Sequence, residues 1–213
     1  LQCGLRGRVR ERCHELRFTK MHGAGNDYIF VDARDLDRDW PALSVAMSDR
    51  HLGVGSDGLI LARESSRADL RMTMFNADGS EGEMCGNGIR CLVGYALTRG
   101  IVPAGRSTVK VETLAGDMKV APAWDDGRVV RATVGMGEPS VAVEDIPVTA
   151  PGHATLMDYP LEIDGRTFKI SCVSMGNPHA VAFVDTPVDE LPLHDVGPKI
   201  EKHPMFPQRV NFE

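Results

Sequence analysis

The feature that most constrains this 213-residue chain is a cysteine-glycine segment directly before a long apolar run. The segment Cys85-Gly86-Asn87-Gly88 precedes helix-forming apolar residues that continue to Leu97, and Gly100 and Pro103 mark the end of that run. We therefore expect a buried helix whose entrance is at Cys85. The first backbone N–H groups of a helix have no partner inside it and carry partial positive charge.

A cysteine in this position has two interpretations. The helix start stabilises a thiolate, and a free thiol with a pKa of about 8.5 can fall to roughly 3.5–7.5 at such a site. The same N–H groups can hold a carboxylate or phosphate, and glycine lets a ligand approach the backbone closely. Alternatively, Cys85 is an inert small hydrophobic residue. That description fits Cys91 better, because Cys91 lies inside the expected helix.

Composition excludes several classes of function. The chain is 42% hydrophobic and 25% charged, with a formal net charge of −6 and no basic stripe, so we expect no nucleic-acid partner. No apolar run approaches the roughly 20 residues that span a bilayer, and no secretion signal is recognisable, so we expect no membrane partner. Five scattered cysteines without a CxxC pair, and seven dispersed histidines, indicate a cytoplasmic protein without a metal site.

The chain divides into three parts. Residues 1–17 are basic and polar and are predicted to be a poorly ordered or non-native extension. Residues 18–134 form a first lobe, and residues 135–213 a second, because proline and glycine become dense after Val134. Short apolar runs predict strands at 28–31, 59–61, 70–75 and 129–134, hairpins at 107–120 and 161–170, and short helices at 41–50 and 191–202.

Seven sequence blocks together resemble one family. They are MHGAGND (21–27), HLGVGSDG (51–58), FNADGSE (75–81), CGNGIR (85–90), MGEP (136–139), SMGNPH (174–179) and RVN (209–211). In order and spacing, from Phe18 to the last residue, they resemble diaminopimelate epimerase. FNADGSE followed closely by CGNG is the most specific part of the match.

The resemblance implies an α+β fold with two similar lobes, each a mostly antiparallel sheet or barrel around a central helix, the second lobe being incomplete in this chain. It implies interconversion of LL-2,6-diaminopimelate and meso-diaminopimelate for lysine and peptidoglycan synthesis. The family works without a metal, pyridoxal phosphate or any other cofactor, so we expect none. A thiolate removes the α-proton from one face and a thiol returns a proton to the other. A homodimer is expected when the protein is full-length.

The resemblance also implies roles for individual residues. Cys85 matches the first catalytic cysteine, and His179 matches a histidine that assists the chemistry. Gly86 and Asn87 match the pair whose backbone holds the substrate at the helix entrance. The substrate-contacting asparagines correspond to Asn26, Asn76, Asn177 and Asn211. From the residues alone, the glycine-rich corner favours a turn residue over a ligand at Asn26.

The chain departs from the family pattern in two places. Gly58 stands where some members have glutamine, and the block with the second catalytic cysteine does not appear within the 213 residues. Cys172 lies in a strand pattern without glycine partners, and Cys3 and Cys13 precede the matched blocks. We therefore expect that the 213-residue chain does not racemise its substrate alone. The alternatives are a proline racemase-like isomerase and a non-catalytic diaminopimelate-binding fragment; a redox or hydrolytic cysteine enzyme is the weakest interpretation.

Overall fold

The structure, a computed structural model, describes residues 16–213, which divide into two compact units between Gly135 and Met136. Each unit has its own sheet and its own hydrophobic core, and the architecture is α+β, as the sequence predicts. Most of the expected 1–17 extension lies outside the described residues, but Leu16 is partly buried against the core of the first unit. None of the helices in the described part of the chain has the length and apolar composition needed to cross a membrane.

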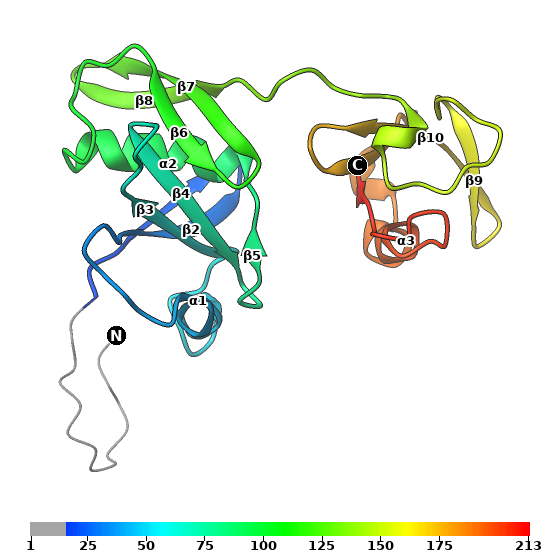
Figure 1. The fold of residues 1–213 in the computed structure, drawn as a ribbon. Helices are drawn as coiled ribbons and strands as arrows, with labels where there is room; N and C mark the ends of the chain where they lie inside the picture. Colours follow the sequence, from blue (N-terminus) through cyan, green and yellow to red (C-terminus); the bar gives the residue numbers. More distant parts are fainter. Residues whose placement is uncertain (1–15) are drawn as a thin grey trace. The chain divides into compact units, whose positions relative to one another are not determined.

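The first unit is a curled eight-stranded sheet with one helix on each face (Figure 1). The strands pair in the order β1-β2-β3-β4-β6-β7-β8, and the short β5 pairs with β4. The strands are β1 (Thr19–Gly23), β2 (Asn26–Asp32), β3 (Gly58–Arg63), β4 (Leu70–Asn76), β5 (Glu81–Gly82), β6 (Val109–Thr113), β7 (Gly116–Asp125) and β8 (Arg128–Val134), and the helices are α1 (Trp40–Ser48) and α2 (Gly86–Thr98).

Two strand pairs in this mostly antiparallel sheet are parallel: β2 with β3, and β4 with β6. Parallel neighbours need a crossover connection, and here each crossover carries a helix. The chain passes through α1 between β2 and β3, and through α2 between β4 and β6. The parallel β2–β3 register sets Tyr28 opposite Gly58, which brings the loops before both strands together.

The central strands are buried on both faces, and their side chains alternate between the two helices. Phe30 and Ile60 point into the cluster that contains α2, whereas Ile29 and Leu59 belong to the cluster beneath α1. Helix α2 is therefore apolar nearly all round: its buried residues include Ile89, Leu92, Val93, Ala96 and Leu97. This burial fixes the position of the start of α2 relative to β1–β3.

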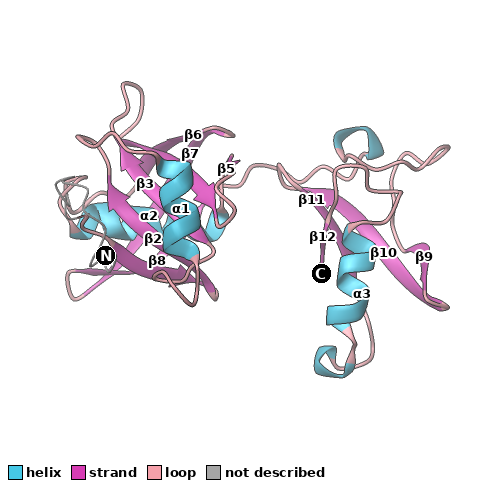
Figure 2. Ribbon diagram, turned by 90° about the horizontal axis from the view of Figure 1, so that it is seen from below, coloured by secondary structure: helices cyan, strands magenta, loops and turns pink. Residues whose placement is uncertain are grey.

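The second unit has a four-stranded sheet in the order β12-β11-β10-β9, with α3 against it (Figure 2). Its elements are η1 (Val143–Asp145), β9 (Tyr159–Ile163), β10 (Arg166–Ser174), β11 (Pro178–Ala182), η2 (Val188–Glu190), α3 (Leu193–Glu201) and β12 (Asn211–Phe212). The β9–β10 hairpin turns at Asp164-Gly165, where both residues have positive φ. Ile170 and Ile200 are fully buried and join the sheet to α3.

Candidate functional site

Cys85 is the N-cap residue of α2, with an extended backbone at φ −133° and ψ 119°. Its Sγ accepts a hydrogen bond from the backbone N–H of Gly88 at 3.4 Å, and the residue is only partly buried. The backbone carbonyl of Cys85 accepts the first intrahelical bond, from Ile89. The sulfur thus occupies the place of the usual serine or aspartate cap, where partial positive charge favours an anion.

Close packing of the helix start explains why Gly88 follows the cysteine. A Cβ on Gly88 would lie 2.5 Å from Cδ1 of Ile60, which is itself fully buried on β3. The first turn of α2 therefore sits directly on the sheet. A similar constraint accounts for Gly58: a Cβ there would come 2.2 Å from the backbone oxygen of Phe75, so a glutamine does not fit this backbone.

Two further side chains reach the sulfur. The Tyr28 hydroxyl donates to Cys85 Sγ at 3.4 Å, and Cys85 Sγ lies 3.7 Å from Asn26 Oδ1, to which a thiol donates. The sequence predicts Asn26 as a site residue, and the structure brings it to Cys85. It predicts Tyr28 only as a strand residue. The one available signal was that a hydroxyl stood in an otherwise apolar run, Tyr28 to Val31.

The side-chain amide of Asn26 is held in one orientation. Its Nδ2 donates to Asp57 Oδ2 at 2.7 Å, and its Oδ1 accepts from Asn87 Nδ2 at 3.3 Å. Asp57 also accepts from the backbone N–H of Asp27 at 3.0 Å and from Arg50 at 2.8 Å. Because Asp57 is acceptor-only when ionised, it fixes the Asn26 oxygen toward the sulfur.

Basic side chains form ion pairs with Asp27 in this loop. Arg50 donates to Asp27 at 2.7 and 3.2 Å, and Lys20 lies 3.0 Å from the same carboxylate. The hydrogen bond from Arg50, followed by that from Lys20, holds the pKa of Asp27 well below its usual range. Sequence reasoning did not find Arg50, Asp57 or Lys20. The contacts of Arg50 and Asp57 arise from the parallel β2–β3 pairing, and the contact of Lys20 with Asp27 arises from the antiparallel β1–β2 pairing.

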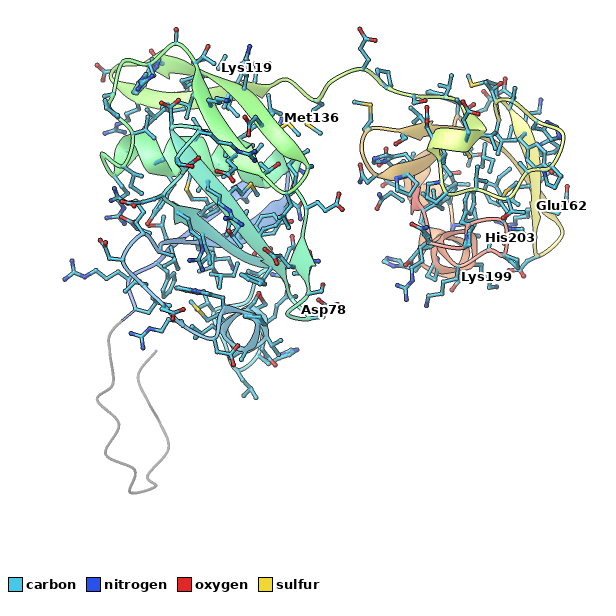
Figure 3. The ribbon with its side chains drawn as sticks, viewed as in Figure 1. Asp78, Lys119, Met136, Glu162, Lys199 and His203 are labelled. Carbon is cyan, nitrogen blue, oxygen red and sulfur yellow. The ribbon has the colours of Figure 1, made fainter. Side chains whose placement is uncertain are left out.

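Asn76 lies apart from the hydrogen bonds around Cys85. It ends β4, and its Nδ2 donates to Ser80 Oγ at 2.9 Å, across a turn whose Asp78 is labelled in Figure 3. The Ser44 hydroxyl on α1 donates to the Asn76 carbonyl at 2.8 Å. Gly86 and Asn87 are the first two residues of α2, and the Asn87 side-chain oxygen accepts from Arg90. Four predicted residues, Asn26, Cys85, Gly86 and Asn87, therefore come together in the first unit.

The predicted residues of the second unit form a separate group. His179 Nε2 lies 3.0 Å from Asn177 Oδ1, and His179 Nδ1 lies 2.9 Å from Glu213 Oε1. Asn211 stands opposite His179 in the parallel β11–β12 pair and donates to the Pro178 carbonyl at 3.1 Å. Glu213 was not predicted from the sequence. An imidazole flanked by two oxygen atoms donates to both of them when it is protonated.

The other described cysteines are buried. Cys91 lies inside α2 and Cys172 within β10. Burial raises the pKa of the Cys91 thiol and raises that of Cys172 to about 11, so both stay protonated near neutral pH. Cys3 and Cys13 lie outside the described residues. Within residues 16–213, no three His, Cys, Asp or Glu side chains gather as ligands for a metal ion.

Comparison with known proteins gives a family match at the sequence level. The family model described as diaminopimelate epimerase matches residues 18–142. A diaminopimelate epimerase of Acetivibrio thermocellus is 49% identical over 199 residues, and one of Pelotomaculum thermopropionicum is 48% identical over 201 residues. Each alignment covers 93% of this chain and 70% of the relative, so the chain spans less than the full length of these proteins.

Solved structures share the fold at low sequence identity. A hydroxyproline epimerase from Agrobacterium vitis aligns with a TM-score of 0.57 at 16% identity, over 87% of this chain and 54% of that one. A probable proline racemase from Agrobacterium radiobacter K84 aligns with a TM-score of 0.56 at 14% identity, over 88% of this chain and 55% of that one. The chain therefore spans about half the length of these structures, and the likeness concerns the fold alone.

Proposed function

This chain belongs to the diaminopimelate epimerase family, and from that premise we propose that it acts in the interconversion of LL-2,6-diaminopimelate and meso-diaminopimelate, with Cys85 removing the α-proton from one face. The observation that carries the proposal is the sulfur of Cys85 at the mouth of α2, 3.4 Å from the Gly88 N–H group. Proline racemases share the fold with this chain, but the sequence match is to the diaminopimelate enzymes.

The reaction begins when the Cys85 thiolate takes the α-proton of the substrate. The electron pair of the C–H bond stays on the α-carbon and spreads into the α-carboxylate, while the sulfur becomes a thiol. An amino-acid α-proton is very weakly acidic, so the developing carboxylate charge must be stabilised by the protein. The free N–H groups at the start of α2, including those of Gly86 and Asn87, suit this task because they point out of the helix mouth.

The asparagines are proposed to bind the polar groups of the substrate without adding charge. An amide offers both donors and acceptors, so it pairs with ammonium and carboxylate groups alike. Asn26 is held at the sulfur by Asp57, whereas Asn76 keeps its amide in the β4–β5 turn. Asn177 and Asn211 are proposed to contribute from the second unit, where His179 assists the proton transfer.

The surroundings of the chemistry are proposed from family membership. We propose that no metal, pyridoxal phosphate or other cofactor takes part, and that the protein works as a homodimer in the cytoplasm, in lysine and peptidoglycan synthesis. Neither Cys91 nor Cys172 suits the thiol that serves the opposite face, because both are buried. Removal of the proton from one face is therefore the step that the described residues support directly.

Hydrogen exchange in deuterated water tests the proposal. LL-diaminopimelate is incubated with the protein in D₂O; loss of the α-proton signal is followed by NMR and formation of the meso isomer by chiral chromatography. Replacement of the acid–base group in Cys85→Ser is expected to slow exchange by at least about 100-fold. Cys91→Ser, a change of the same kind on the same helix, is the matched control and should leave exchange unchanged.

Exchange at the same rate in Cys85→Ser and the unaltered protein would refute the role of Cys85. Calorimetry separates the binding-only alternative: tight binding of diaminopimelate with no exchange, together with slow alkylation of Cys85, would indicate a non-catalytic binding protein. Faster exchange with proline than with LL-diaminopimelate would favour the racemase alternative.

A further inference from the structure

The hydroxyl group of Tyr28 has no part in the chemistry described so far, yet it is directed at the reacting sulfur. It comes from β2, on the sheet face that packs against α2, and lies 3.4 Å from Cys85 Sγ. Tyr28 is 5% exposed, so the phenol is held there by the core. A buried tyrosine hydroxyl needs a hydrogen-bond partner, and here that partner is the cysteine.

We infer that Tyr28 activates Cys85 by donating a hydrogen bond to the thiolate, so that the sulfur anion has two donors: the Gly88 N–H group and the Tyr28 hydroxyl. The inference deepens the proposed function and rests on it, because it concerns the same sulfur. It assigns a role to a side chain that lies outside the cysteine, glycine and asparagine set.

The direction of the hydrogen bond follows from the surroundings of the phenol. Burial raises the pKa of Tyr28 well above its usual range, and the neighbouring sulfur raises it further. The phenol therefore keeps its proton around neutral pH, where it can donate to the sulfur. A protonated phenol next to a sulfur anion can only donate, and hydrogen bonds to a charged acceptor are about twice as strong as neutral ones.

Other polar and charged groups also lie near the sulfur and the phenol, and some of them favour the protonated thiol. Asn26 Oδ1 faces the sulfur and accepts from a thiol, and Asp57 holds the amide in that orientation. The charges of Asp57 and Asp27 act on Tyr28, and those of Arg90 and Cys85 act on Cys91 further along α2. The Asn26 oxygen favours the thiol, whereas Tyr28 and the helix start favour the thiolate. The sulfur thus has groups beside it that can partner both its thiolate and its thiol, as a group that both takes and returns a proton requires.

Titration of the thiol tests the inference without substrate. The rate of iodoacetamide alkylation is measured between pH 5 and 10, and trypsin isolates Cys85 as the single cysteine of peptide 72–90 while Cys91 falls in peptide 91–99. Tyr28→Phe keeps the ring and removes the donor, so the thiolate loses a charge-assisted hydrogen bond. We expect the apparent pKa of Cys85 to rise by about one unit and alkylation at pH 7 to slow about tenfold.

Tyr95→Phe is the matched control. Tyr95 is buried in the same core cluster, but its ring faces Arg99, whose guanidinium carbon lies 5.8 Å from the ring centroid. The Cys85 profile should not move in this variant. A second variant carries 3-fluorotyrosine at position 28, a more acidic phenol that donates a stronger hydrogen bond. The Cys85 pKa should then fall, which loss of packing would not produce.

The outcomes separate the inference from the proposed function. An unchanged Cys85 profile in both position-28 variants would overturn the role of Tyr28, even if α-proton exchange continues. A rise with Tyr28→Phe and a fall with 3-fluorotyrosine would support it, even if diaminopimelate is not the substrate. Equal shifts in Tyr28→Phe and Tyr95→Phe would attribute the effect to general loosening of the core and overturn the inference.

Discussion

The two cysteines of α2 stand six positions apart on one helix and meet opposite surroundings. Cys85 caps the helix, is partly exposed, and has the Gly88 N–H group and the Tyr28 hydroxyl directed at its sulfur. Cys91 lies inside the helix, 9% exposed, with its sulfur packed toward Gly23 of β1. Burial raises the pKa of Cys91, so its thiol stays protonated.

Position along the helix therefore decides what a cysteine does here. Free N–H groups exist only in the first turn, so an anion is stabilised at the mouth and penalised in the interior. Cys172 gives a third case, since it lies within a strand, away from any helix start, and burial raises its pKa to about 11.

Alkylation rates should distinguish the three cysteines most strongly. In the native protein at pH 7.5, Cys85 should react with iodoacetamide at least about 100-fold faster than Cys91 or Cys172, because the buried thiols react only after local opening. Tryptic peptides 72–90, 91–99 and 170–199 report the three residues separately. In 8 M urea the three rates should converge. Comparable native rates for Cys85 and Cys91 would show that the helix start does not make Cys85 more reactive.

The next effect concerns two glycines of α2. Gly88→Ala places a methyl group 2.5 Å from Ile60 Cδ1, whereas Gly94→Ala meets only Met21 and Val129 at 3.9 and 4.0 Å. Overpacking costs typically about 1–3 kcal/mol, and replacing a helical glycine with alanine gains up to about 1 kcal/mol. We expect Gly88→Ala to destabilise the first unit and to slow Cys85 alkylation, and Gly94→Ala to stabilise it.

Urea unfolding followed by tryptophan fluorescence measures this difference, since both tryptophans, Trp40 and Trp124, belong to the first unit. If the two alanine variants shift the midpoint equally and in the same direction, close packing of the helix start against Ile60 does not explain why residue 88 is a glycine.

Much of this arrangement was accessible from the sequence because its signals are local. The Cys85–Gly88 segment before an apolar run predicts a helix entrance, and the structure starts α2 at Gly86. Asp164-Gly165 predicts a hairpin tip, and β9 and β10 turn there. Turn residues and helix caps act within a few positions of the chain, so they can be predicted without tertiary knowledge.

The rest depended on contacts between distant segments. The parallel β2–β3 pair brings Asp57 beside Asp27, and no short-range pattern predicts that register. The sequence predicts Tyr28 only as a strand residue. Its contact with the sulfur exists because α2 packs across β2 and places Cys85 at its hydroxyl. From the sequence, Gly58 is interpreted as the loss of a polar contact. In the structure no side chain fits at this position, because the Phe75 oxygen lies too close.

The ion pairs of Asp27 with Arg50 and Lys20, near the Cys85 end of α2, should have a smaller effect. Hydrogen bonds from Arg50 and then Lys20 hold the pKa of Asp27 below its unfolded value of 3.8. A carboxylate with a lowered folded-state pKa stabilises the fold fully above the unfolded pKa, and this contribution is lost as the pH falls through the folded pKa. Asp27→Asn should therefore lower the urea midpoint of the first unit at pH 7, and the difference from the unaltered protein should shrink below pH 4.

This substitution also separates the start of the helix from its interior. The Asp27 backbone N–H donates to Asp57, which in turn orients Asn26 at the sulfur, so loosening this loop should alter Cys85 alkylation. Cys91 lies outside this chain of hydrogen bonds and should react as slowly as before. Lys199, paired with Asp164 in the second unit, supplies the control: Asp164→Asn removes a surface ion pair but should leave Cys85 untouched at every pH. A stability difference for Asp27→Asn that stays constant from pH 7 to pH 3 would show that the ion pairs do not support this end of the helix.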